Sequence, residues 1–118
     1  MIVEDEKDLC YMLALILKKQ NLSTVCANSI SEARQTINRI NPRILFVDNH
    51  LPDGSGTDFI GQVKSLYPAI KIIMITAYDA PVDVKKAFNN GADYFISKPF
   101  TSAAVKKALS LFAAGNAA

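Results

Sequence analysis

The stretch "ILFVDNHLPDGSG", residues 44–56, decides how the rest of the chain is interpreted. Its first four residues are all apolar, which is typical of a strand buried on both faces in a parallel sheet. Asp48 follows them directly, and Pro52, Gly54 and Gly56 then turn the chain away. The stretch therefore predicts a buried strand that ends on a carboxylate at the edge of a sheet.

Other apolar runs along the chain alternate with helical patterns. Runs of strand type occur at 1–3, 23–27, 43–47, 71–76 and 93–97. Between them, apolar residues recur at helical spacing within 9–17, 30–40, 59–66, 84–88 and 105–112. Parallel strands need crossover connections, and the alternation of strand and helix supplies them. We therefore predict an α/β fold, with a doubly wound five-stranded parallel sheet and five helices on its two faces.

The chain has 118 residues, half of them hydrophobic, which suits one globular domain. We expect residues 1–118 to form this domain, with a frayed tail at 113–118 and no output domain. The two cysteines indicate reduced thiols, and no run reaches the roughly 18 apolar residues of a membrane span. The net charge of +2 gives no ground for nucleic-acid binding. These features predict a soluble cytoplasmic protein that does not bind nucleic acid or a membrane directly.

Polar residues follow four of the five predicted strands. Glu4 and Asp5 come after the first, Asp48 after the third, Thr76 ends the fourth, and Lys98 follows the fifth. Each of them alone has an ordinary explanation, such as a helix cap, a strand threonine or a solvated lysine. Together they meet at the carboxyl edge of the sheet, where open α/β sheets bind their ligands.

The acidic residues at this edge predict a cation. Carboxylates gathered in one pocket repel one another by about 4 kcal/mol per pair, at a separation of about 4 Å and an effective dielectric constant of about 20. All-oxygen ligation of this kind suits Mg²⁺, which also shares ligands readily with a phosphate. With Mg²⁺, Lys98 and the Thr76 hydroxyl around it, Asp48 is predicted to accept a phosphoryl group.

Four segments give the chain a specific resemblance to the receiver domain of response regulators in two-component phosphorelay signalling. They are "IVEDE" at 2–6, "PRILFVDNHLPDGSG" at 42–56, "IIMITAYD" at 72–79 and "NGADYFISKPF" at 90–100. The resemblance extends over essentially the whole chain. It implies a flavodoxin-like fold with the strand order 2-1-3-4-5. A chemotaxis receiver of this family is a well-known example of that order.

The resemblance also implies roles for the residues at the edge. Asp48 would be the phosphoacceptor, and the phosphoryl group would come from a phosphohistidine on a sensor histidine kinase or a phosphotransfer protein. Mg²⁺, or Mn²⁺ in its place, would bind Asp5, Asp48 and the backbone carbonyl of His50, and would reach Glu4 through water. Lys98 would pair with the phosphoryl group. The domain would thus catalyse its own phosphorylation and autodephosphorylation without turning over an external substrate.

A switch is implied as well. Thr76 would turn inward to hydrogen-bond the phosphoryl group, and Phe95 would follow it. His50 and Tyr78 occupy positions that flank the path of the hydrolytic water in the family, and the bulk of Tyr78 predicts slow autodephosphorylation. Pro99 matches a position where the preceding peptide bond is often cis.

The implied output surface comprises the helical segment 84–88, the strand 93–97 and the last helical segment. An output domain, a downstream target or a phosphorylation-dependent dimer would use this surface. A degenerate receiver that only binds proteins, independently of phosphorylation, remains the alternative. A phosphatase of the haloacid-dehalogenase type is disfavoured, because its second aspartate would stand at position 50, where this chain has His50.

Overall fold

The protein forms a five-stranded parallel sheet, in the order β2-β1-β3-β6-β7 along the sheet. The computed structural model describes the backbone of residues 1–77 and 81–117 and the side chains of 1–77 and 84–112. Because β6 and β7 are the fourth and fifth strands of this sheet, the predicted order 2-1-3-4-5 is confirmed. The sheet strands are β1 (Ile2–Val3), β2 (Cys26–Ala27), β3 (Ile44–Asp48), β6 (Lys71–Thr76) and β7 (Tyr94–Ser97).

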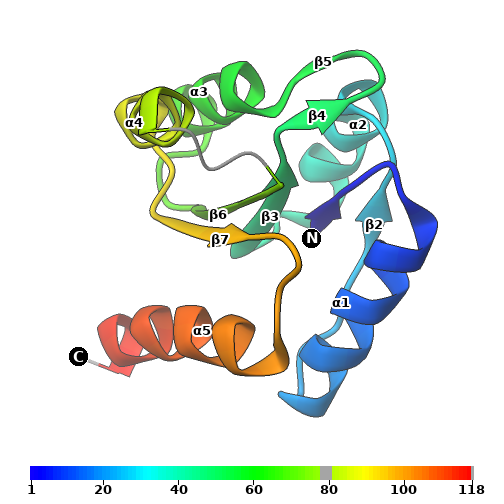
Figure 1. Ribbon diagram of the computed structural model, residues 1–118, viewed down its shortest axis with the longest axis vertical. Helices are drawn as coiled ribbons and strands as arrows, with labels where there is room; N and C mark the ends of the chain where they lie inside the picture. The colour runs from blue at the N-terminus through cyan, green and yellow to red at the C-terminus, as the bar shows by residue number, and fades with distance from the viewer. Residues whose placement is uncertain (78–80, 118) are drawn as a thin grey trace.

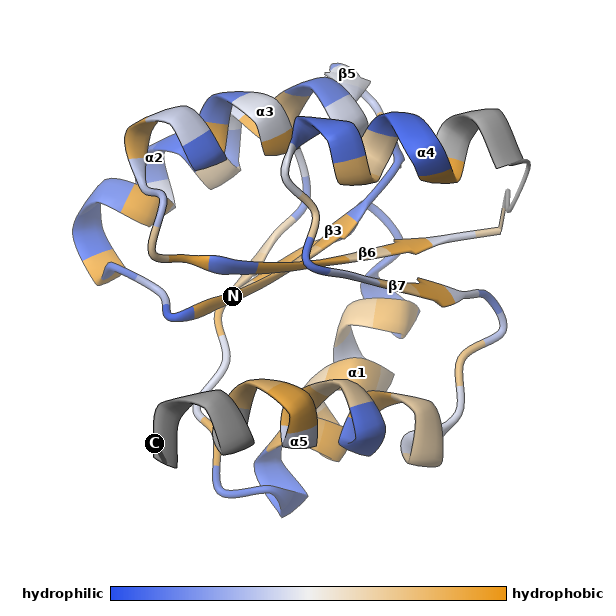
Figure 2. Cartoon of the chain, turned by 90° about the vertical axis from the view of Figure 1, so that its left-hand side faces the viewer, coloured by the Kyte–Doolittle hydropathy of each residue, from blue (hydrophilic) through white to orange (hydrophobic). Residues whose placement is uncertain are grey.

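Helices cover both faces of the sheet (Figure 1). Figure 2 shows α1 and α5 on one side and α2, α3 and α4 on the other. None of the helices in the described part of the chain has both the length and the apolar character needed to cross a membrane. The final helix includes most of the segment expected to be a frayed tail, and whether that segment frays stays a prediction. The helices are α1 (Lys7–Lys19), α2 (Ile30–Ile40), α3 (Gly56–Leu66), α4 (Pro81–Asn90) and α5 (Ser102–Ala117).

The strand pleat divides the core into two clusters, one on each face. Phe46 on β3 pairs with Ile73 on β6, and both side chains pack in the cluster beneath α1 and α5. The next pair along, Val47 and Met74, packs in the cluster beneath α2, α3 and α4. Successive side chains of a strand point to opposite faces, so a strand buried on both sides needs an unbroken apolar run. This is why residues 44–47 show no polar alternation.

A two-stranded antiparallel hairpin follows β3, where the sequence predicts only a loop. Its strands are β4 (His50–Leu51) and β5 (Gly54–Ser55), with His50 paired to Ser55 and Leu51 to Gly54. Leu51 is buried against the core, which holds the hairpin on the body of the domain. The acceptor strand is therefore followed by an ordered element, which leads directly into α3 at Gly56.

Candidate functional site

Three acidic side chains gather at the carboxyl edge of the two central strands. Glu4 and Asp5 follow β1, and Asp48 is the last residue of the neighbouring strand β3. One carboxylate oxygen from each of the three lies within 4.8 Å of the others. Glu4 and Asp48 are only 5% and 6% exposed, whereas Asp5 is exposed. The structure thus brings together the acids that the sequence predicts at one edge.

Lys98 brings a positive charge into this group from the end of β7. Its Nζ lies 2.7 Å from Glu4 Oε1 and 3.4 Å from Asp48 Oδ1. Burial alone would lower the pKa of Lys98, but the hydrogen bond to Glu4 and the charge of Asp48 outweigh it, so the pKa is raised. Lys98 is therefore a fixed ammonium group that contacts the predicted acceptor. Its peptide bond to Pro99 is cis, as the family resemblance implies.

The ionised form of Glu4 is disfavoured in the fold, even with Lys98 beside it. Burial, together with a hydrogen bond shared with Asp48, raises the pKa of Glu4 to about 7. Asp5 adds a backbone contact, since its N–H donates to Glu4 Oε2 at 3.1 Å. Among the described residues, Lys98 pairs with two of the three grouped carboxylates, and a divalent cation would offset the excess of negative charge.

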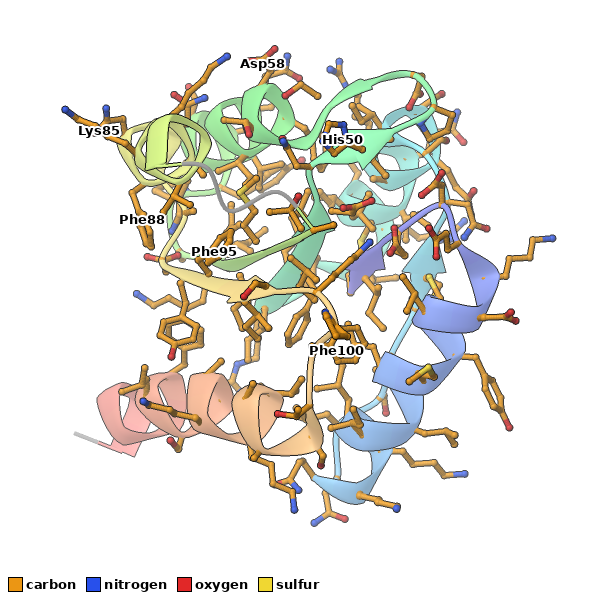
Figure 3. All side chains as sticks on the ribbon, in the orientation of Figure 1. His50, Asp58, Lys85, Phe88, Phe95 and Phe100 are labelled. Atoms are coloured by element: carbon orange, nitrogen blue, oxygen red, sulfur yellow. The ribbon has the colours of Figure 1, made fainter. Side chains whose placement is uncertain are left out.

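The predicted switch residues lie on the two strands beyond Asp48. Thr76 ends β6 and is fully buried, and its carbonyl accepts the Lys98 N–H at 2.9 Å. Phe95 on β7 is half-buried and packs against the cluster that includes Ala87 of α4. Figure 3 shows the Phe95 ring on the side of the sheet that faces α4. Thr76 and Phe95 thus lie on neighbouring strands, and a backbone hydrogen bond joins Thr76 to Lys98.

The two residues predicted to tune dephosphorylation are placed differently. His50 begins the hairpin strand β4 and is exposed (Figure 3). Tyr78 lies outside the described residues, so its predicted role stays a prediction.

Several residues that support the site are absent from the sequence prediction. Asn28, just before α2, donates from Nδ2 to the Glu4 carbonyl at 2.9 Å, and the Cys10 thiol donates to the same oxygen at 3.4 Å. Asn49 Oδ1 accepts from Thr57 Oγ1 at 2.6 Å, which ties the residue after Asp48 to α3. Asn28 and Asn49 are in loops and Cys10 is in α1, and no pattern in the sequence shows which groups they contact.

The sequence profile of the response regulator receiver domain matches residues 1–110. This chain belongs to that family. The response regulator protein PilR of Pseudomonas aeruginosa is 34% identical over 99 residues, which are 84% of this chain and 22% of PilR. This chain thus spans about a fifth of the length of that regulator.

Solved receiver domains also share the fold. The receiver domain of NtrX from Brucella abortus is 27% identical, with a TM-score of 0.86 over 92% of each chain. A CheY-like receiver domain from Methanospirillum hungatei is 26% identical, with a TM-score of 0.87 over 92% of this chain and 87% of that one. The predicted family and the flavodoxin-like receiver fold are both confirmed.

Proposed function

We propose that this receiver domain accepts a phosphoryl group on Asp48 from a phosphohistidine of a sensor histidine kinase or phosphotransfer protein. The observation that carries the proposal is the convergence of the Lys98 ammonium and two further carboxylates on Asp48. The Lys98 ammonium group lies 3.4 Å from the buried Asp48 carboxylate, so a fixed positive charge stands beside the group that would attack phosphorus.

The donor set at this edge fits Mg²⁺, and Mn²⁺ would suit the same oxygens. Asp5, Asp48 and the His50 backbone carbonyl would hold the ion, and Glu4 would reach it through water. Hard oxygen donors and an excess of negative charge are the features that Mg²⁺ sites share. Bound there, Mg²⁺ would neutralise charge on the transferring phosphoryl oxygens.

The residues of the chain have separate tasks in the transfer. An Asp48 carboxylate oxygen attacks phosphorus as the bond to the donor imidazole nitrogen breaks, and the imidazole leaves carrying that electron pair. Lys98 moves from Glu4 to an equatorial phosphoryl oxygen, where its charge stabilises the transition state. Thr76 then supplies its hydroxyl to the product, an acyl phosphate on Asp48.

The acyl phosphate would act by shifting the population of two conformers. The favoured conformer is the one in which Thr76 and Phe95 both point toward the site. The surface that changes is formed by α4, β7 and α5, on which Lys85, Lys86, Lys106 and Lys107 are exposed. An output domain of a longer protein, a separate target or a second copy of the domain would bind there. A cytoplasmic location follows from this signalling role.

The function is tested by incubating the protein with acetyl phosphate and Mg²⁺ and measuring the intact mass. We expect a gain of one phosphoryl group that requires Mg²⁺ and is lost in Asp48→Asn. A beryllofluoride titration followed by amide chemical shifts reports the same site without a covalent product. No mass gain, together with unchanged amide shifts near Asp48 and Thr76, would favour the phosphorylation-independent binding module instead.

A further inference from the structure

The tip of the β4–β5 hairpin is bound to the first turn of α2. Asp53, in the turn between the two strands, accepts the Ile30 N–H on Oδ1 at 2.8 Å and the Ser31 N–H on Oδ2 at 2.9 Å. These N–H groups have no partner within the helix, and a helix N-terminus favours negative charge. The same two bonds lower the pKa of Asp53. Asp53 is therefore ionised at neutral pH and holds two elements together.

Apolar contacts reinforce this attachment. Leu51 of the hairpin and Ile30 of α2 are buried in the same core cluster. Gly54 has a φ of +153° and lies so close to α2 that a Cβ there would be 3.0 Å from Ile30 Cδ1. The hairpin thus rests on α2 through both the Asp53 carboxylate and its apolar side.

The base of the hairpin is fixed at the acceptor strand. The Gly56 N–H donates to the Asn49 carbonyl at 2.8 Å, and a Cβ on Gly56 would lie 2.1 Å from the Asp48 carbonyl oxygen. His50 lies between this base and the tip at Asp53, paired with Ser55. The direction of the His50 backbone carbonyl therefore depends on both attachments.

The start of α2 also holds the other loop that carries acidic residues. Asn28 donates to the Glu4 carbonyl at 2.9 Å, and the Asn28 N–H donates to Glu32 Oε2 of α2 at 3.3 Å. The loops that carry Glu4 and His50 are thus both bound to one helix end. Loss of one of these attachments, from Asn28 or from Asp53, would let the two loops move relative to each other.

We propose that Asp53 is a positioning residue for the metal site, which fixes the His50 carbonyl relative to Asp48 by holding the hairpin on α2. The inference rests on the proposed function, since it assumes that Mg²⁺ binds at this edge. Groups that orient metal ligands without touching the metal contribute about 10- to 100-fold to metal affinity. Loss of the Asp53 carboxylate leaves the tip of the hairpin held on α2 by apolar contacts alone, which do not fix its orientation.

The test compares the Mg²⁺ affinity of two variants that weaken the same helix end. Asp53→Ala removes the polar attachment of the hairpin, whereas Ser29→Ala removes the bond that the Glu32 N–H donates to Ser29 Oγ at 3.1 Å. Mg²⁺ is titrated into the chain, and the dissociation constant is read from amide shifts of the folded molecules. We expect about tenfold weaker binding in Asp53→Ala and a wild-type constant in Ser29→Ala, because only the first frees a metal-bearing element.

Salt separates positioning from simple loss of a negative charge. Raising the ionic strength from about 0.15 M to about 1 M shortens the Debye length from about 8 Å to about 3 Å. A charge effect fades over this range, whereas we expect the ratio between Asp53→Ala and wild type to persist. A ratio that falls to one at high salt, or equal constants in the two variants, overturns this inference alone. A wild-type chain that does not bind Mg²⁺ overturns the proposed metal site as well.

Discussion

At the scale of single residues, Glu4 is a carboxylic acid whose ionised form the fold disfavours. Its pKa is raised from 4.5 to about 7, first by burial and then by the hydrogen bond shared with Asp48. The folded state therefore binds a proton more tightly than the unfolded state between these two values. Stability without metal is highest below pH 4.5 as far as Glu4 is concerned, and it falls as the pH rises through about 7.

We predict that Glu4→Gln removes this part of the pH dependence. Near pH 8 the variant should be more stable than metal-free wild type by about 2–3 kcal/mol, because no buried charge has to form. Urea unfolding at several pH values measures the difference. Asp58→Asn is the control, since Asp58 is exposed and forms its ion pair with the exposed Lys86. A wild-type stability that stays level through neutral pH would contradict the prediction.

The Cys10 thiol should be unreactive toward alkylating reagents in the folded protein. Burial, with the neighbouring Cys26 thiol as a further cause, raises the pKa of Cys10 to about 12. At pH 8 its thiolate fraction would be about 10⁻⁴, and the thiolate is the form that reacts. We predict that iodoacetamide spares Cys10 in the native protein and modifies it after unfolding in guanidinium. Peptide mass spectrometry measures both, and rapid native labelling of Cys10 would contradict the prediction.

At the scale of elements, the sequence predicts the sheet well and the hairpin not at all. Unbroken apolar runs predict β3 and β6 closely, because both strands are buried on both faces. Strand β2 is shorter than the predicted 23–27, since it begins only at Cys26. The segment at 50–55 contains proline, glycine and a single buried apolar side chain, so no periodicity marks its two short strands. The sequence does not predict the Asp53 attachment either, because Asp53 binds residues that lie 23 and 22 positions before it in the chain.

The start of α3 offers a paired test of close packing. A Cβ on Gly56 would lie 2.1 Å from the Asp48 carbonyl oxygen, whereas the atoms nearest to a Cβ on Gly61 would be those of the Asn90 side chain, at 3.7 Å. We predict that Gly56→Ala destabilises the domain by about 2–4 kcal/mol, since the backbone after Asp48 must move.

Gly61→Ala should instead stabilise the domain by about 0.5–1 kcal/mol, through helix propensity and a less flexible unfolded chain. Thermal unfolding of both variants gives the comparison. Equal effects at the two glycines would contradict the close approach at Gly56.

At the scale of the whole molecule, two lysines bind buried or half-buried acids at opposite edges of the sheet. Lys98 lies at the carboxyl edge with Glu4 and Asp48. Lys64 of α3 lies at the amino edge, where its Nζ is 2.8 Å from Asp93 Oδ2 and 2.6 Å from the Ile70 carbonyl. Both pairs join elements distant in sequence, so removing either lysine leaves an acid without its cation. Among the residues that the structure describes, a group of three acids that could bind Mg²⁺ occurs at the carboxyl edge.

We predict that Lys98→Met and Lys64→Met differ in their response to Mg²⁺. Without metal, each variant should lose about 2–4 kcal/mol of stability, because a poorly solvated carboxylate is left unpaired. Added Mg²⁺ stabilises by an amount that grows with its affinity for the folded state. Lys98→Met should therefore gain more stability from Mg²⁺ than wild type does, since the ion no longer competes with the ammonium group for Glu4 and Asp48.

Lys64→Met should gain as much stability from Mg²⁺ as wild type, and phosphorylation by acetyl phosphate should be lost only in Lys98→Met. Urea unfolding with and without Mg²⁺ measures these differences, and a smaller gain in Lys98→Met than in wild type would show that Lys98 supports metal binding.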